Sequence, residues 1–180
     1  MNNILIISNR LGIGGAEKLL IELVTFAQKN NINPTVLILD SYDEEHYDRI
    51  LKTQGVKVVR TRINNIKHFR APAKMMRSAW WAVKLKYFAA KYYKSIHTIG
   101  LYNVDKVFDT VLHSHRFFWN VNNAVQFPKR EYAYQQEIFG NPNDTIVSIN
   151  KYQETELFSQ YGNAIKAKMV LAKLFINDQD

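Results

Sequence analysis

The stretch that decides the fold is ILIISNRLGIGGAEKLLIELVTFA, residues 4–27. Its first four residues are β-favouring and apolar without interruption, which is typical of a strand buried on both faces of a parallel sheet. A loop rich in glycine follows at residues 9–15, and apolar residues then recur at helical spacing over residues 19–27. The stretch therefore predicts a strand, a glycine loop and a helix.

The same alternation of buried strands and helices continues along the chain. Further strands are predicted at residues 35–39, 56–59, 95–100, 116–121 and 144–149, and helices at residues 43–54, 72–95, 103–114 and 151–161. Strands that alternate with helices are joined by right-handed crossovers. We therefore expect an α/β fold, a doubly wound parallel sheet (Rossmann-like) of about six or seven strands with helices on both faces, in the order 3-2-1-4-5-6. Residues 1–168 form this domain, and residues 169–180 form a last strand or a linker.

Composition excludes several classes of protein. The chain has 180 residues, 47% of them hydrophobic, which is too apolar for disorder and fits one domain. Its apolar runs are far shorter than the ~18 residues of a spanning helix, and the N-terminus lacks the basic region of a signal peptide. Without cysteine it has no disulfides and no thiolate zinc site, and His113 and His115 are spaced too closely to pair on a helix. We expect no metal, and no serine lies in a hydrolase turn.

The glycine loop admits three interpretations. A glycine turn before a helix places backbone N–H groups where an anion binds. A dinucleotide site has the pattern G-x-G-x-x-G with an acidic residue about 20 positions on. Here Glu17 stands at the third glycine position after Gly12 and Gly14, although Asp40 does follow the second strand. The remaining alternatives are a purely structural turn and the resemblance described next.

The string Gly14-Gly15-Ala16-Glu17, followed by the helix and the second strand, resembles the N-terminal domain of GT-B fold glycosyltransferases, most closely the retaining glycosyltransferase family 4. Residues 145–148, followed by a helix that ends at Tyr161 and Gly162, are similar to the last strand and helix of that domain. The resemblance implies the acceptor-side half of an enzyme that transfers a sugar from a nucleotide-diphosphate sugar to a glycan or lipid-linked acceptor, in cell-surface polysaccharide synthesis. It implies no cofactor.

In the family, the residues that hold the nucleotide diphosphate lie in a C-terminal domain. We therefore expect this chain to be inactive alone, either as an excised N-terminal half or as a subunit that another chain completes. The oxidoreductase domain and a non-catalytic binding subunit stay as alternatives.

The resemblance also assigns substrate-binding positions. Gly14, Gly15 and Glu17 match the family's loop, in which the glycine backbone approaches the donor phosphate or the acceptor. The family has a histidine after its fourth strand. Here His97 lies within the predicted fourth strand, and His115 would match only if the segment before it were not a helix. Asn122 and Asn123, after the fifth strand, are positional candidates for substrate hydrogen bonds. The catalytic residues stay unassigned.

The net charge of +8 comes from one segment. Residues 49–104 contain thirteen basic residues and no acidic one, so the rest of the chain carries eleven basic and sixteen acidic residues. Within the predicted helix at residues 72–95, a core face is expected at Met76, Ala79, Trp80, Val83, Tyr87 and Ala90. A neighbouring stripe, expected to face a membrane or a partner, consists of Lys74, Arg77, Trp81, Lys84, Phe88 and Lys91. Cations that flank aromatic rings suit an anionic membrane surface, although a missing domain could equally cover them. A nucleic-acid partner is disfavoured because no such motif is present. We expect a cytoplasmic protein, peripheral on the inner face of the membrane.

Overall fold

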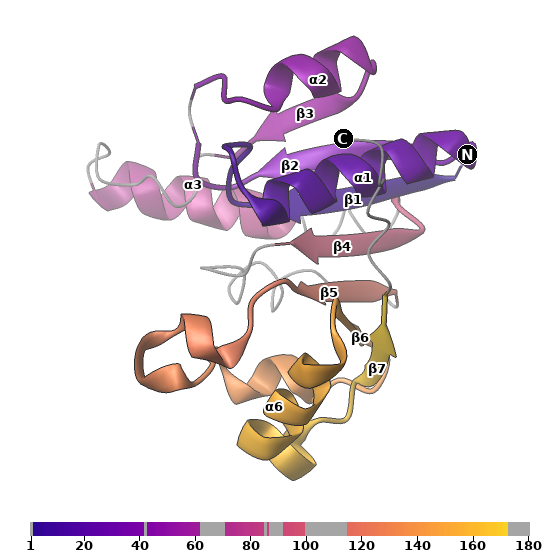
Figure 1. Cartoon of the computed structure of the whole chain (residues 1–180). Coiled ribbons are helices and arrows are strands. Elements are labelled where there is room, and N and C mark those ends of the chain that lie inside the picture. Colours follow the sequence, from indigo (N-terminus) through magenta and orange to yellow (C-terminus); the bar gives the residue numbers. More distant parts are fainter. Residues whose placement is uncertain are drawn as a thin grey trace.

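The computed structural model describes residues 2–41, 43–61, 71–84, 86, 92–99 and 115–172. In this part of the chain the main helices and strands follow one another in the order β1 (Asn3–Ser8), α1 (Gly15–Lys29), β2 (Asn33–Ile38), α2 (Asp48–Thr53), β3 (Lys57–Arg60), α3 (Ala71–Lys84), β4 (Ser95–Ile99), β5 (Arg116–Asn120), β6 (Thr145–Ser148), α6 (Lys151–Tyr161) and β7 (Lys168–Leu171) (Figure 1). Short 3-10 turns occupy the β5–β6 connection, among them η3 (Ala124–Gln126) and η5 (Gln136–Phe139).

The strands form one parallel sheet in the order β3-β2-β1-β4-β5-β6-β7. The predicted doubly wound α/β fold and its strand order are confirmed, with β7 added beside β6. The register places Leu5 beside Ile96 and Ile6 beside His97, so alternate residues of β1 and β4 point to opposite faces. The strand order reverses at β1, because β2 and β3 lie on one side of it and β4 lies on the other. This is the topological switch point at which ligands bind in such sheets.

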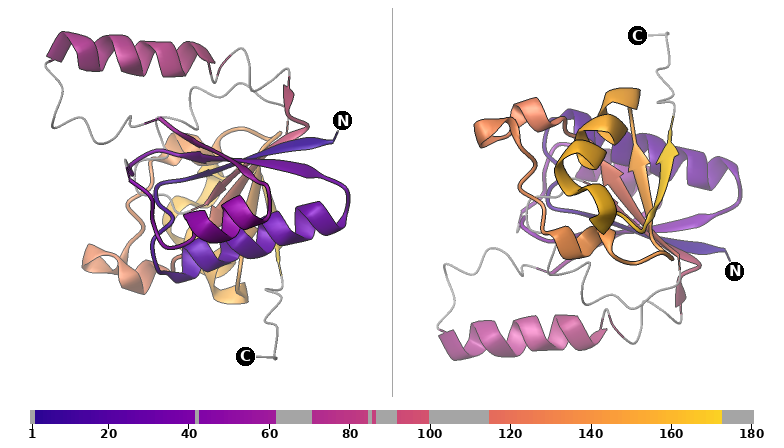
Figure 2. Two further views of the ribbon diagram at one scale, coloured as in Figure 1. Left: turned by 90° about the horizontal axis from the view of Figure 1, so that it is seen from above. Right: turned by 90° about the horizontal axis from the view of Figure 1, so that it is seen from below.

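Helices cover both faces of the sheet. α1 and α2 lie on the side opposite α3 (Figure 2). One core contains Ile6 of β1 together with Leu20 of α1 and Leu51 of α2. The other contains Leu5 of β1 and Leu157 of α6. The two cores explain why the central strands read as continuous apolar runs.

Two helix ends follow local rules. The side chain of Asn150 accepts hydrogen bonds from the backbone N–H groups of Tyr152 and Gln153, which makes Asn150 the N-cap of α6. Gly162 ends the same helix with a φ of 48°, in the left-handed region that favours glycine. By contrast, α2 begins at Asp48 rather than at the predicted residue 43, because the Asp48 carboxylate accepts the N–H of Glu45 and holds the preceding residues in a turn.

The predicted faces of α3 are wrong. Trp81 is only 8% exposed and packs in the core that contains Leu5, whereas Met76, Trp80 and Val83 are exposed. The single large ring of Trp81 is therefore the inward contact. Tyr87, Phe88, Ala90 and Lys91, the side chains of Lys74, Arg77 and Lys84, and the predicted helix at residues 103–114 lie outside the described residues.

Candidate functional site

The glycine loop lies at the carboxyl edge of the sheet, between β1 and α1. Gly14 is the N-cap residue of α1 and has no side chain to cap it, and its carbonyl accepts the first helical hydrogen bond, from the N–H of Lys18. The loop is tied down at Leu11, whose side chain is fully buried. A fixed loop at the open N-terminus of a 15-residue helix is suited to binding an anion.

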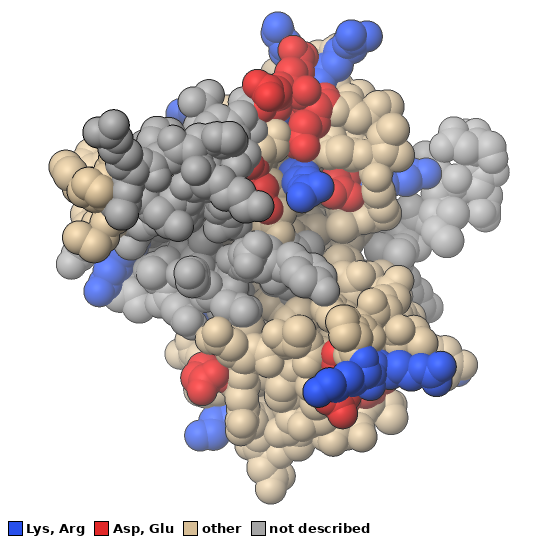
Figure 3. Space-filling model, turned by 90° about the vertical axis from the view of Figure 1, so that its left-hand side faces the viewer, with Lys and Arg blue, Asp and Glu red and all other residues tan. Residues whose placement is uncertain are grey.

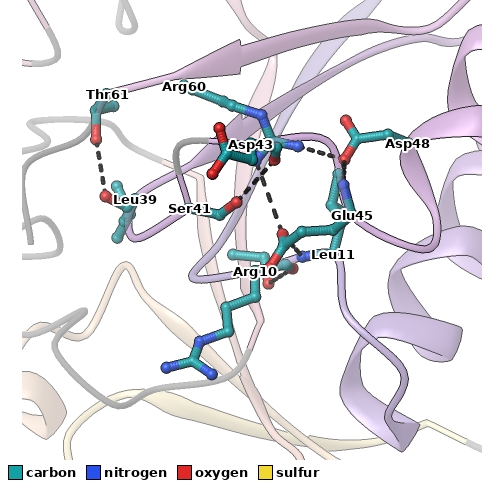
Figure 4. A network of polar contacts seen from close by, with 10 residues as sticks. Arg10, Leu11, Leu39, Ser41, Asp43, Glu45, Asp48, Arg60 and Thr61 are labelled. Atoms are coloured by element: carbon teal, nitrogen blue, oxygen red, sulfur yellow. Dashed lines mark hydrogen bonds and ion pairs between the residues drawn. The ribbon is translucent and has the colours of Figure 1, made fainter. Parts of the chain in front are cut away.

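Glu45 clamps this loop from the β2–α2 connection. Its Oε2 accepts the N–H of Leu11 at 2.6 Å, and the carbonyl of Leu11 accepts the N–H of Tyr47 at 3.0 Å. Arg60, at the end of β3, pairs with Asp48 and lies 3.7 Å from Glu45 Oε2 (Figure 4). These groups are largely buried, and together they fix both polar backbone groups of Leu11.

From the sequence, none of Glu45, Asp48 and Arg60 was assigned to a site. The predicted strand order could have indicated that these three residues lie close together. Parallel strands bring the residues that follow β2 and β3 to the same edge, where an arginine meets carboxylates. Viewed onto this edge, acidic and basic side chains lie next to each other at the end formed by the α2 region (Figure 3).

The loop glycines differ in what surrounds them. A Cβ added to Gly14 would overlap Glu17 Oε2, so the Glu17 carboxylate lies back over the start of α1. A Cβ added to Gly12 or Gly15 would meet no atom within 4 Å, and none of the three has a positive φ. Neither packing nor backbone conformation in the described part of the chain therefore requires glycine at Gly12 and Gly15.

Two exposed side chains flank these glycines. Ile13 is 83% exposed at the tip of the loop. The side chain of Arg10 is exposed, and its guanidinium points away from the Glu45 and Arg60 network (Figure 4). The loop thus presents backbone N–H groups, one cation and one apolar side chain at the switch point.

Asn122 and Asn123 lie at the same edge, after β5, and both are engaged within the protein. Asn122 Nδ2 donates to Gln126 Oε1 at 3.1 Å. Asn123 Nδ2 donates to Glu156 Oε2 at 3.3 Å, and its Oδ1 accepts from Asn150 at 3.0 Å. The contacts of Asn123 hold the loop against α6, and the side-chain contact of Asn122 lies within the loop, so both residues have a structural role. The structure brings the loop of β5 and the glycine loop to one edge, as the parallel sheet requires.

His97 lies within β4, away from the glycine loop, and both of its ring nitrogens have partners. Trp119 Nε1–H donates to His97 Nδ1 at 3.2 Å, which leaves the proton on Nε2, and this nitrogen donates to Ser95 Oγ at 2.9 Å. The ring stacks on Phe117 with centroids 4.6 Å apart. Burial lowers the pKa of His97 to about 4, because a charged imidazolium would lose water. Protonating Nδ1 would also remove the acceptor of the Trp119 N–H.

The lowered pKa of His97 should make the free energy of unfolding depend on pH. The pKa of His97 is about 4 in the folded chain and 6.5 when unfolded, so the unfolded chain binds more protons between these values. The contribution is fully present above pH 6.5 and is lost as the pH falls towards 4, by at most about 3 kcal/mol. We expect His97→Gln to flatten this part of the curve, measured as the difference in urea-unfolding free energy between wild type and variant at each pH. A constant difference across that range would contradict the prediction.

No group of histidine, cysteine and carboxylate side chains suited to a metal ion occurs among the described residues. Within the same residues, no helix has both the length and the apolar character needed to cross a membrane.

The fold and this edge define a Rossmann-like α/β domain with its loops gathered at the switch point. A glycosyltransferase from Rickettsia africae ESF-5 has a similar structure, with a TM-score of 0.61 and 13% sequence identity over 94% of this chain. The likeness confirms a glycosyltransferase-like fold, and membership of family 4 stays a prediction. The chain spans 42% of the length of that glycosyltransferase. No protein-family model matches the sequence, and no curated protein matches it.

Proposed function

We propose that the chain is the N-terminal, acceptor-side half of a retaining GT-B glycosyltransferase. In this proposal the complete enzyme transfers a sugar from a nucleotide-diphosphate sugar to a glycan or lipid-linked acceptor, in cell-surface polysaccharide synthesis in the cytoplasm. The fold likeness and the G-G-x-E loop support the proposal, and the coverage of 42% of the neighbour's length fits one half of a two-domain enzyme.

The observation that carries the proposal is the open space at Gly12 and Gly15. A side chain at either position would clash with nothing in the described chain, so glycine there serves a close approach from outside. The approaching group meets backbone N–H groups and the positive end of α1, which favours a phosphate or a polar sugar. Glycine at Gly15 lets such a group contact the backbone directly.

Transfer requires the leaving diphosphate to be held and its charge stabilised. The glycine loop offers one wall for this, and the other wall belongs to a second domain or subunit. The isolated chain is therefore expected to bind ligands weakly and to turn over none. A sugar-transfer assay on the isolated chain tests this, and turnover would contradict it.

An oxidoreductase domain is the alternative that the strand order favours, because 3-2-1-4-5-6 is also the dinucleotide-binding order. Glu17 opposes it. This residue stands where the dinucleotide pattern has its third glycine, the residue that lets the helix pack closely on the strand. The dinucleotide pattern is therefore incomplete, and we favour the transferase.

Substitution of Gly15 tests the site. We expect Gly15→Val to weaken the binding of nucleotide sugars by about tenfold, or ~1.4 kcal/mol, while leaving the melting temperature unchanged. The measurement is a ¹⁵N–¹H NMR titration with UDP-glucose and GDP-mannose, in which the Gly12, Gly14 and Gly15 amides should shift.

Gly162→Ala is the control, with the opposite expected effects on stability and binding. It forces a side chain into a φ of 48° and should cost roughly 1 kcal/mol of stability without changing the titration. Shifts produced by NAD⁺ and not by nucleotide sugars would favour the oxidoreductase. Equal binding by wild type and Gly15→Val would show that the loop is a structural turn.

A further inference from the structure

The exposed face of α3 is apolar. Met75 and Met76 are 73% and 74% exposed, Trp80 is 61% exposed and Val83 is 50% exposed. At about 100° per residue, Met76, Trp80 and Val83 fall within one narrow stripe, and Met75 lies about 80° from Val83, outside it. A surface helix normally turns such a stripe towards the core, so α3 displays what other helices bury.

Trp81 holds the helix in this orientation. It projects from roughly the opposite side to Met76 and Val83, and it packs in the core with Leu5 and Phe118. Since α3 lies on the side of the sheet away from α1 and α2 (Figure 2), its outer stripe points away from the glycine loop's helix. The core contact and the exposed stripe are therefore two separate surfaces of one helix.

The segment of sequence that contains α3 carries charge of one sign. Residues 49–104, which include all of α3, contain thirteen lysine and arginine residues and no acidic residue. An apolar stripe without accompanying charge would suit a protein partner. An apolar stripe with tryptophan, set in a segment that is only basic, instead complements a surface that offers hydrocarbon and negative charge together.

We propose that α3 is an interfacial docking helix for an anionic lipid bilayer, with Met76, Trp80 and Val83 entering the boundary between headgroups and acyl chains. Basic residues are attracted to an anionic surface, and tryptophan concentrates at membrane interfaces. The binding of an amphipathic helix grows with the apolar area that it buries and with this electrostatic attraction. A chain docked in this way keeps the α1 face directed away from the bilayer.

Vesicle co-sedimentation tests the proposal on the 180-residue chain. We expect binding to phosphatidylglycerol vesicles at low salt, weaker binding at high salt, and little binding to phosphatidylcholine vesicles. The variant Met76→Ser with Trp80→Ser should bind phosphatidylglycerol at least about tenfold more weakly. Both positions are exposed, so its melting temperature should match that of wild type.

The matched control is Phe158→Ser, which removes a side chain that is 45% exposed on α6. It should bind vesicles as wild type does. Equal binding by the α3 variant and wild type, or an equal loss in both variants, would overturn the proposal. So would a dimer in sedimentation velocity that the α3 variant abolishes, because a second copy would then cover the stripe. No sugar or nucleotide enters this assay, so its outcome is independent of the proposed transferase activity.

Discussion

Replacing Asp144 by alanine is expected to lower the free energy of unfolding by about 3–5 kcal/mol. Asp144 is 1% exposed, and Arg116 donates to it from Nε at 2.8 Å and from Nη2 at 2.6 Å. The two residues join the starts of β5 and β6. Without the carboxylate, the guanidinium would stay buried with its charge uncompensated. Urea unfolding measures the loss.

The loss should depend on leaving one charge alone. The double replacement Arg116→Met with Asp144→Leu removes both charges and keeps apolar volume, so it should recover most of the stability. Glu131→Ala, at an exposed carboxylate, should change stability by less than about 0.5 kcal/mol. A loss at Asp144 no larger than that at Glu131 would show that water solvates the arginine.

The sheet could be predicted from the sequence because each of its rules is local. Residues 4–7 are apolar without a break, which only a strand covered on both faces requires. Strands that alternate with helices then leave few topologies once crossovers are right-handed. The order 3-2-1-4-5-6 is one of the common orders that remain, and each of them places the glycine loop at the carboxyl edge.

The face of α3 could not be predicted in the same way. Its sequence offers Met76, Trp80 and Val83 on one side and Trp81 on the other, and apolar spacing alone favours the larger set. The structure buries the single ring of Trp81 instead. Amphipathic spacing identifies a stripe that avoids water, but it does not say whether the core or another surface covers it.

The individual polar pairs could not be predicted for a different reason. Glu45 and Leu11 are 34 positions apart, and Asp144 and Arg116 are 28 apart. Such pairs become visible only when the register of the sheet is known. The internal hydrogen bonds of His97 and Asn123 also join residues far apart in the sequence, and the prediction that these two residues contact substrate stays a prediction.

Replacing Glu156 by alanine is expected to cost about 2–3 kcal/mol of stability and to loosen the loop after β5. Glu156 Oε2 accepts three hydrogen bonds, from Tyr132 Oη–H at 2.7 Å, from the N–H of Ala124 at 3.1 Å and from Asn123 Nδ2 at 3.3 Å. Burial first, and the bond to Glu156 second, raise the pKa of Tyr132. The neutral hydroxyl is therefore the form that the fold needs.

Two measurements separate the global from the local effect of this change. Urea unfolding gives the loss of stability, and hydrogen exchange should show the Ala124 amide losing protection below the unfolding limit. Glu156→Gln keeps an acceptor oxygen and should cost about 1 kcal/mol. Glu154→Ala, at an exposed position of the same helix, removes only a favourable charge in its first turn and should cost less than about 1 kcal/mol.

The Glu156→Ala variant also tests the role of Asn122 and Asn123. If Glu156 holds their loop in place, its loss should disturb the loop's geometry while leaving the glycine loop, which Glu45 holds separately, unchanged. Nucleotide-sugar shifts at Gly12 and Gly15 should then survive in Glu156→Ala. If those shifts disappear while the fold persists, the loop after β5 takes part in the same binding site. That result would support the prediction that Asn122 and Asn123 contact the ligand.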